Sequence, residues 1–287
     1  MTDFPFALAE TGPRGTPPLL FLHGFMGSRR DWDPVIAQLA RTRRCIAVDL
    51  PGHGETGAPA DEALWTPDGC VAALAGLLRA AGGGSVVGYS LGGRIALQLA
   101  IEHPGAVARA ALVSASPGIA GECGRAQRRN IDEGQARRLE KGGLEAFLED
   151  WYRQPLFAAL REHPRFPEVL GRRRRNDARL LARSLRQMGT GIQRSLWRDL
   201  PALRVPLLLL AGERDEKFTD LVFDMAARSP AAEALVVRGR GHALIEEDPE
   251  AVAREVGAFV DAAPRGAPPD ARGRSPEAPT SGAGGAS

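Results

Sequence analysis

Ser90 is the residue of this chain whose surroundings point most directly to chemistry, because it stands in the pentapeptide Gly88-Tyr89-Ser90-Leu91-Gly92. An apolar run precedes this pentapeptide, and a helical pattern from Arg94 to Ala100 follows it. A Gly-x-Ser-x-Gly turn between a strand and a helix lifts the serine hydroxyl above the end of the strand, and the glycines let strand and helix approach closely. The free N–H groups and the dipole of the helix N-terminus favour negative charge there. The pentapeptide therefore predicts a reactive serine beside a site for an oxyanion.

A serine hydroxyl is a weak nucleophile or base by itself, so Ser90 needs a histidine in contact and a carboxylate that orients this histidine. Asp215 follows the apolar run Leu207 to Ala211, and His242 follows the next apolar run. This is the chain order serine, acid, histidine, and it places both partners just after predicted strands, at the sheet edge where ligands bind. Glu213 is the rival acid. We favour Asp215 because its shorter side chain after the turn fits the pattern better.

A second loop is expected to complete the oxyanion site. His23-Gly24-Phe25 follows the first predicted strand, and a loop at this place supplies the second backbone donor. We expect the N–H groups of Phe25 and Leu91 to be the two donors. The remaining histidines are expected to shape loops or to lie on the surface: His23, His53, His103 and His163.

These side chains need a sheet to position them, and short apolar runs supply its strands. The runs alternate with helical patterns and are mostly apolar throughout, which is typical of parallel strands covered on both faces. The sequence therefore predicts an α/β fold with a mostly parallel, doubly wound sheet. The predicted strands are Leu19–Leu22, Cys45–Asp49, Ser85–Tyr89, Ala110–Ser114, Leu207–Ala211 and Ala234–Val237.

Residues 117–201, between the fourth and fifth predicted strands, are helix-compatible and predict a helical cap inserted above the sheet. Glycines are expected to break its early part, at Gly118, Gly121, Gly124 and Gly134. A later helix is expected within Asp177 to Trp197, from the spacing of Leu180, Leu181, Leu185, Met188 and Ile192. The core then comprises residues 1–116 and 202–263. Residues 264–287 lack large apolar side chains and are expected to form a disordered tail.

Charge is unevenly distributed over the 287 residues. The whole chain has a net charge of +2, but residues 117–201 hold 18 basic against 11 acidic side chains, and the remainder holds 19 against 24. The cap is therefore expected to attract anions. Nearly all the basic residues are arginine, whose planar fork suits carboxylates, although an arginine-rich genome would give the same composition. The predicted partner is a small anionic molecule.

Composition narrows the class of protein further. With 44% hydrophobic and 25% charged residues and no apolar run long enough for a bilayer, the chain reads as a globular protein without a membrane partner. Met1 to Glu10 lacks the pattern of a cleaved secretory signal. Cys45, Cys70 and Cys123 cannot all pair and form no metal-ligand cluster, so we expect reduced thiols in the cytoplasm and no metal. We expect no cofactor and no nucleic acid, and a monomer or small homo-oligomer.

The chain up to about Asp261 resembles the α/β-hydrolase superfamily. Within it, several motifs are similar to those of the 2-succinyl-6-hydroxy-2,4-cyclohexadiene-1-carboxylate synthases of menaquinone biosynthesis. Two of these motifs are not expected together in general esterases: Asp150-Trp151-Tyr152-Arg153-Gln154-Pro155-Leu156-Phe157 and Gly212-Glu213-Arg214-Asp215-Glu216-Lys217-Phe218. The others are Leu22-His23-Gly24-Phe25-Met26-Gly27-Ser28 with Trp32, Val48-Asp49-Leu50-Pro51-Gly52-His53-Gly54, and Gly88-Tyr89-Ser90-Leu91-Gly92-Gly93-Arg94.

The resemblance implies a lyase that eliminates pyruvate from 2-succinyl-5-enolpyruvyl-6-hydroxy-3-cyclohexene-1-carboxylate, a substrate with three carboxylates. Ser90, assisted by His242 and Asp215, would remove a ring proton, and the Phe25 and Leu91 amides would stabilise the resulting oxyanion. Two other functions stay open. One is a serine hydrolase that acts through an acyl-enzyme on a carboxylate-bearing ester or a carbon–carbon bond, and the other is a non-enzymatic ligand receptor.

The resemblance also implies which residues hold this substrate. Arg94, Arg128 and Arg173 match carboxylate-binding arginines, and Tyr89 and Trp151 match an aromatic lining. The register is open at two of these positions. Arg172 or Arg174 can take the place of Arg173, and Arg129 that of Arg128.

Overall fold

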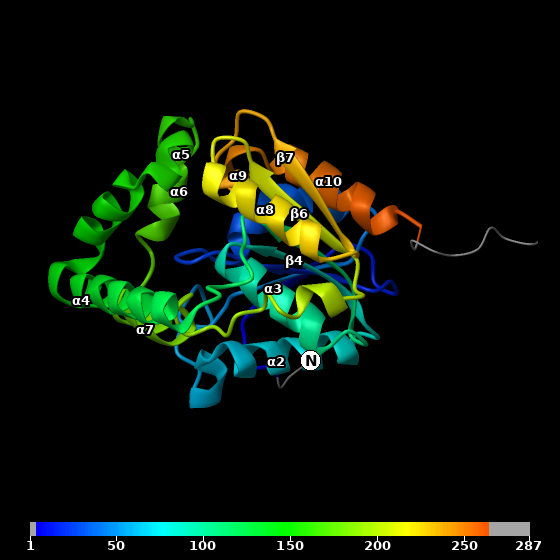
Figure 1. The fold of residues 1–287 in the computed structure, drawn as a ribbon, viewed down its shortest axis with the longest axis horizontal. Coiled ribbons are helices and arrows are strands. Elements are labelled where there is room, and N and C mark those ends of the chain that lie inside the picture. The colour runs from blue at the N-terminus through cyan, green and yellow to red at the C-terminus, as the bar shows by residue number, and fades with distance from the viewer. Residues whose placement is uncertain (1–3, 264–287) are drawn as a thin grey trace, which may run out of the picture.

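A seven-stranded sheet forms the centre of the molecule in the computed structural model, which describes residues 4–263 (Figure 1). The strand order is β1-β3-β2-β4-β5-β6-β7; β1 runs antiparallel to β3, and all other pairs are parallel. The strands are β1 Leu8–Thr11, β2 Leu19–Leu22, β3 Cys45–Val48, β4 Gly84–Tyr89, β5 Val107–Val113, β6 Leu207–Gly212 and β7 Ala232–Val237. The predicted α/β class with a mostly parallel sheet is confirmed.

The central strands are apolar because helices cover both faces of the sheet. In β2, Leu20 and Leu22 pack into the core on one face, whereas Leu19 and Phe21 pack into the core on the other, as the two-residue period of a strand requires. The first core is closed by α2 Pro67–Ala80, α3 Leu91–Glu102 and α8 Glu216–Arg228. The second is closed by α1 Asp33–Leu39, α9 Leu244–Glu247 and α10 Pro249–Asp261.

The register of the sheet brings the carboxyl ends of its strands to one edge. Leu22 at the end of β2 pairs with Gly88 of β4, Tyr89 at the end of β4 pairs with Val113, and Gly212 pairs with Val237. The loops that carry the predicted site residues follow these ends directly. Residues more than a hundred positions apart in sequence are thereby positioned around one place.

Four helices between β5 and β6 pack together at one side of the core (Figure 1). We call them the cap helices: α4 Glu122–Arg153, α5 Ala158–Glu162, α6 Phe166–Arg173 and α7 Ala178–Met188. They share an apolar cluster that includes Leu139, Phe147, Leu148, Leu181 and Leu185. This cluster gives the cap helices a core of their own. Four short 3-10 helices connect other elements: η1 Arg29–Trp32, η2 Glu62–Trp65, η3 Pro155–Phe157 and η4 Leu200–Ala202.

The expected breaks at Gly124 and Gly134 were wrong, because α4 runs through both residues. Nothing lies within 4 Å of a Cβ built on Gly134, so this glycine needs neither a turn nor a close approach. The helix kinks later, at Gly143, whose φ of +79° is in the left-handed region. Gly121 does precede the helix as its N-cap.

Two further predictions differ from the structure. The helix expected to include Ile192 ends earlier, at Met188, and Ile192 lies beyond it with its side chain partly exposed. Strand β1 was missed because its residues alternate between partly buried and exposed at the edge of the sheet. The tail predicted for residues 264–287 lies outside the described residues. Between residues 4 and 263, no helix is both long and apolar enough to cross a membrane.

Candidate active site

The turn at Ser90 has the strained geometry that its sequence predicts. Ser90 has φ +50° and ψ −105°, and its amide donates a hydrogen bond of 2.9 Å to the carbonyl of Val113. A Cβ on Gly88 would lie 2.3 Å from the carbonyl oxygen of Gly92, and one on Gly92 would lie 2.2 Å from that of Leu22. Only glycine fits at these two positions. The close packing holds the start of α3 against the sheet with the hydroxyl of Ser90 above it.

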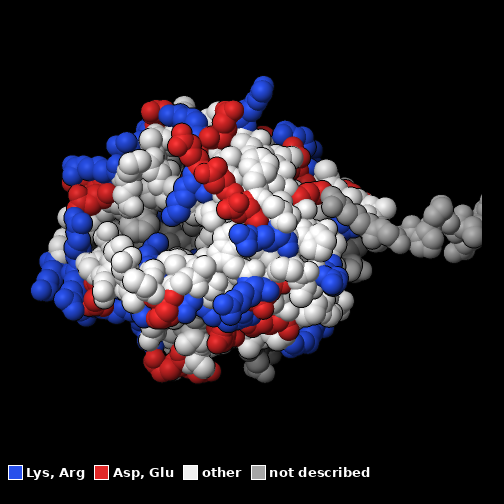
Figure 2. Space-filling view, viewed as in Figure 1, with Lys and Arg blue, Asp and Glu red and all other residues white. Residues whose placement is uncertain are grey.

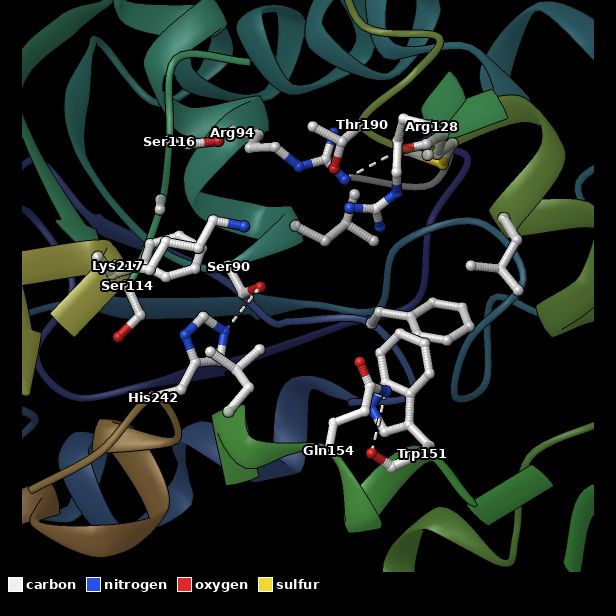
Figure 3. Close-up of a pocket in the computed structure, with 18 of the residues that line it drawn as sticks. Ser90, Arg94, Ser114, Ser116, Arg128, Trp151, Gln154, Thr190, Lys217 and His242 are labelled. Carbon is white, nitrogen blue, oxygen red and sulfur yellow. Dashed lines mark hydrogen bonds between the residues drawn. The ribbon is translucent and has the colours of Figure 1, made fainter. Parts of the chain in front are cut away.

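The structure brings Ser90, His242 and Asp215 together (Figure 3 shows the first two). The Nε2 atom of His242 lies 3.4 Å from the Ser90 Oγ, and its Nδ1 lies 2.7 Å from the Asp215 Oδ2. Asp215 and His242 are both buried. A histidine that donates its Nδ1–H to a carboxylate keeps Nε2 free to accept the serine proton. The rival acid Glu213 instead accepts a hydrogen bond of 2.8 Å from the amide of Gly239.

A second carboxylate, Glu247, supports the loop of His242, and no local pattern in the sequence predicts this role. Its two carboxyl oxygens accept hydrogen bonds from the amides of Gly241 and Ala243, on either side of the histidine. Burial raises the pKa of Glu247 above its usual range. The ring of Phe218 packs against the imidazole at 4.5 Å between centroids. These contacts fix the orientation of His242 from several sides.

The backbone of the His23-Gly24-Phe25 loop lies beside the start of α3. The amide of Gly92 donates a hydrogen bond of 3.0 Å to the carbonyl of His23, which ties the loop to the helix. Leu91 is the first residue of α3, so its N–H has no acceptor within the helix. Phe25 and Leu91 both line the pocket of Ser90. His23 is structural, because its ring contacts the carbonyl of Gly24 and accepts a hydrogen bond from the amide of Leu50.

A pocket of about 210 Å³ opens above Ser90 between the core and the cap helices. Figure 2 shows the surface hollowed on this side of the molecule, with basic side chains at the hollow. The core contributes Ser90 and His242 to the lining, and the cap helices contribute Arg128 and Trp151. No Asp or Glu is among the lining residues. The polar and charged ones are Ser90, Arg94, Ser114, Ser116, Arg128, Gln154, Ser184, Thr190, Lys217 and His242 (Figure 3).

Arg94 and Arg128 lie together on one side of the pocket (Figure 3). Arg94 is buried, and its guanidinium donates hydrogen bonds to neutral oxygens of Gln193 at 2.8 Å and Met188 at 3.0 Å. Burial and the nearby charge of Arg128 lower the pKa of Arg94 to about 10. Arg128 donates from Nε to Asp132 at 2.8 Å. Arg129, the alternative to Arg128, does not line the pocket and pairs with Glu122.

Arg173 does not line this pocket. It borders a small adjoining cavity of about 40 Å³, which Tyr89 and Trp151 also line and where Ser90 and His242 form part of the wall. Neither of its alternatives lines the pocket of Ser90. Arg172 lines neither cavity, and Arg174 pairs with Glu145 on the exposed surface.

Lys217, Gln154 and Thr190 also line the pocket, and none of them was predicted from the sequence as a site residue. Lys217 and Gln154 stand inside the two motifs that carry the family resemblance, so a signal for them was present. Thr190 follows α7 in a loop whose path depends on the packing of the cap helices. Nothing local in the sequence distinguishes it.

Comparisons with known proteins place this chain in a well-populated fold. The alpha/beta hydrolase family model matches residues 19–255. A putative 2-succinyl-6-hydroxy-2,4-cyclohexadiene-1-carboxylate synthase from Bacillus subtilis is 34% identical over 260 residues, which are 89% of this chain and 94% of that protein. The solved structure of MenH from S. aureus superposes with a TM-score of 0.83 at 32% identity, covering 89% of this chain and 97% of that one.

A much longer relative also matches. The chloroplast protein PHYLLO of Arabidopsis thaliana is 34% identical over 215 residues, which are 72% of this chain. The matched region is only 12% of PHYLLO, so this chain corresponds to one part of that protein.

Proposed function

This chain belongs to the α/β hydrolase family and, within it, to the 2-succinyl-6-hydroxy-2,4-cyclohexadiene-1-carboxylate synthases, and we propose that it eliminates pyruvate from 2-succinyl-5-enolpyruvyl-6-hydroxy-3-cyclohexene-1-carboxylate. One observation on this chain itself supports the proposed substrate, independently of the family. A serine, histidine and aspartate constellation opens into a pocket whose ionic side chains, apart from the histidine, are two arginines and a lysine. A substrate with three carboxylates complements that charge.

The reaction begins with the ring proton next to the succinyl ketone. His242 accepts the proton of Ser90, and the Ser90 oxygen removes the ring proton. The electrons of the broken C–H bond form a ring double bond, the existing double bond shifts by one position, and the C–O bond to the enolpyruvyl group breaks. The leaving enolate takes up a proton and becomes pyruvate. All electrons stay within the substrate, so the step requires no oxidant, reductant or cofactor.

The site residues divide into three tasks. The N–H groups of Phe25 and Leu91 stabilise the negative charge that develops on the ketone oxygen. Arg94 and Arg128 bind carboxylates, and Trp151 covers the ring. Asp215 keeps the imidazole of His242 oriented and stabilises its positive charge after proton transfer.

A serine hydrolase that forms an acyl-enzyme would use the same three side chains, so the triad alone does not separate the two functions. The basic lining favours the tricarboxylate substrate over a neutral ester. A ligand receptor is disfavoured because it has no need of an imidazole held between a serine and a carboxylate.

The test is a coupled assay for pyruvate with the enzymatically prepared tricarboxylate as substrate. We expect pyruvate and the dicarboxylate diene to form in equal amounts. Pyruvate release at the uncatalysed rate, together with rapid hydrolysis of a carboxylate-bearing ester, would overturn the proposal in favour of the hydrolase.

We also propose that the enzyme works in the cytoplasm and without a macromolecular partner. Cys45 and Cys70 are free and buried, which suits a reducing compartment. Every residue assigned to the site comes from one chain, so a monomer or a small homo-oligomer suffices and no nucleic acid is needed.

A further inference from the structure

The structure points to Lys217, instead of Arg173, as the third cation that binds a carboxylate of the substrate. This inference rests on the proposed function, because it assigns a partner to the third of the three carboxylates. It departs from what the family resemblance implies for Arg173.

The charge of Arg173 is already neutralised by two buried carboxylates. Its guanidinium lies 2.8 Å from Asp31 and 3.2 Å from Glu246, and all three side chains are buried. Arg172 contacts the same two carboxylates. Two arginines and two acids make this cluster neutral when all are ionised. The Nε–H of Arg173 has no acceptor among the described residues, but a substrate carboxylate there would bring a further negative charge beside two buried protein carboxylates, which is costly.

The same cluster has a structural task. Arg172 and Arg173 belong to α6 of the cap helices, whereas Asp31 lies in η1 and Glu246 in α9 of the core. The four side chains therefore fasten the cap to the core beside the catalytic pocket. This task explains why Arg173 is buried and paired with carboxylates of the core.

Lys217 has the opposite surroundings. It is exposed, lines the same pocket as Ser90, and its ammonium forms no ion pair with the described carboxylates. Its ammonium nitrogen makes a cation–π contact with the ring of Phe218, at 5.5 Å from the ring centroid. Figure 3 shows the side chain reaching into the pocket beside Ser90.

The position of Lys217 follows from the fold. Asp215 caps the N-terminus of α8, and Lys217 stands two residues later in its first turn. The turn that presents the triad carboxylate to His242 thus also presents an ammonium to the pocket. A cation in the first turn of a helix interacts unfavourably with the helix dipole, so Lys217 does not stabilise α8 there. Its position is better explained by the binding of an anionic ligand.

These positions distribute the positive charge over the pocket. Arg94 and Arg128 stand close enough for their charges to interact, and they can share one or two carboxylates on their side. Lys217 is the other Lys or Arg of the lining, and it reaches the pocket from α8, whereas Arg94 belongs to α3 and Arg128 to α4. A ring that carries carboxylates on different arms would then contact cations from three different helices.

The test is to measure kcat and KM for pyruvate release by the wild type, Lys217→Gln and Lys217→Arg. We expect Lys217→Gln to raise KM about tenfold with a smaller change in kcat, as the loss of one charge-assisted contact gives. Lys217→Arg should recover most of this loss because it restores the positive charge. Lys141→Gln is the matched control, since Lys141 is the only other lysine and lies on α4 outside this pocket.

Arg173→Gln separates the two assignments. It should lower Tm by about 5 °C or more, because it leaves two buried carboxylates with only Arg172 as their shared partner in the cluster, whereas Lys217→Gln should leave Tm unchanged. An unchanged KM in Lys217→Gln, with the wild type releasing pyruvate, would overturn the inference and leave the proposed function standing. A wild type that releases no pyruvate would contradict the proposed function instead.

Discussion

At the scale of single residues, the candidate chemistry depends on side chains that each follow a different strand. Ser90 follows β4, Asp215 follows β6 and His242 follows β7. Each is held by contacts other than those to its catalytic partners. Ser90 is fixed by its strained backbone, Asp215 by its role as N-cap of α8, and His242 by the carboxylate of Glu247 below its loop. Such support keeps a proton-transfer site rigid.

Arg94 should contribute to substrate binding more than to the chemical step. We expect Arg94→Ala to raise KM about tenfold or more while kcat falls less, because we propose that the guanidinium binds a carboxylate that does not react. Steady-state kinetics of pyruvate release provide the measurement, and Arg179→Ala on the exposed face of α7 is the control. A variant that loses kcat at unchanged KM would place Arg94 in the chemical step.

The triad could be predicted from the sequence because each of its members has a local signal. Ser90 stands between glycines, and Asp215 and His242 each follow an apolar run. The surroundings of Arg173 had no such signal. Its partners Asp31 and Glu246 lie 142 and 73 positions away, so only the folded chain reveals that its charge is neutralised.

At the scale of elements, the junction of β4 and α3 is the least tolerant part of the fold. We expect Gly92→Ala to destabilise the protein by about 1–3 kcal/mol or more and to lower kcat, because the added methyl would collide with the backbone of β2. Chemical denaturation and the pyruvate assay give the two readouts.

Gly76→Ala is the matched control for this variant. Gly76 lies within α2, and nothing stands within 4 Å of a Cβ built on it. There the same substitution should stabilise the protein by about 0.5–1 kcal/mol through helix propensity, with activity unchanged. Equal effects of the two substitutions would contradict the packing argument.

The six parallel strands of the sheet were predicted at the right places, whereas the edge strand β1 was missed and the helices of the cap were predicted less well. A buried parallel strand is apolar at every position, so its signal is contained in four to seven residues. The path of α4 through Gly124 and Gly134 depends instead on tertiary packing against α7, which outweighs the modest cost of a glycine within a helix. The family resemblance and the fold class are confirmed by the relatives that match along most of the chain.

At the scale of the whole molecule, the cap and the core meet around two different ionic environments. One is the ion-paired cluster of Arg172, Arg173, Asp31 and Glu246, and the other is the basic pocket above Ser90. The net charge of residues 117–201 suggested an anion-binding cap, but many of its arginines are paired with carboxylates on the surface. Net charge therefore indicated the kind of ligand without indicating which arginines bind it.

Buried histidines should make the stability of the molecule depend on pH. Burial lowers the pKa of His53 to about 3, from an ordinary value of 6.5. Between these values the unfolded chain binds a proton that the folded chain does not, so the free energy of unfolding falls as pH falls below about 6.5. From His53 alone we expect a loss of about 2 kcal/mol between pH 7 and pH 5. The pKa of His23 is also lowered by burial, which adds a loss of the same sign.

The comparison variant is His53→Asn, which can keep the hydrogen bond from His53 to the carbonyl of Pro51 but does not titrate in this range. Urea denaturation at pH 7 and pH 5 should show a smaller loss of stability in the variant than in the wild type. Equal losses in the two proteins would mean that His53 is not held neutral in the folded state.

The central claim is that Ser90 acts as a base and forms no covalent intermediate. Intact-protein mass spectrometry of a quenched single turnover tests it most directly, with pyruvate measured in the same samples. We expect pyruvate to appear while the mass of the protein stays unchanged, and we expect Ser90→Ala to release pyruvate about 10²–10⁴-fold more slowly. An acyl group that appears on Ser90 and decays as the product forms would contradict the claim.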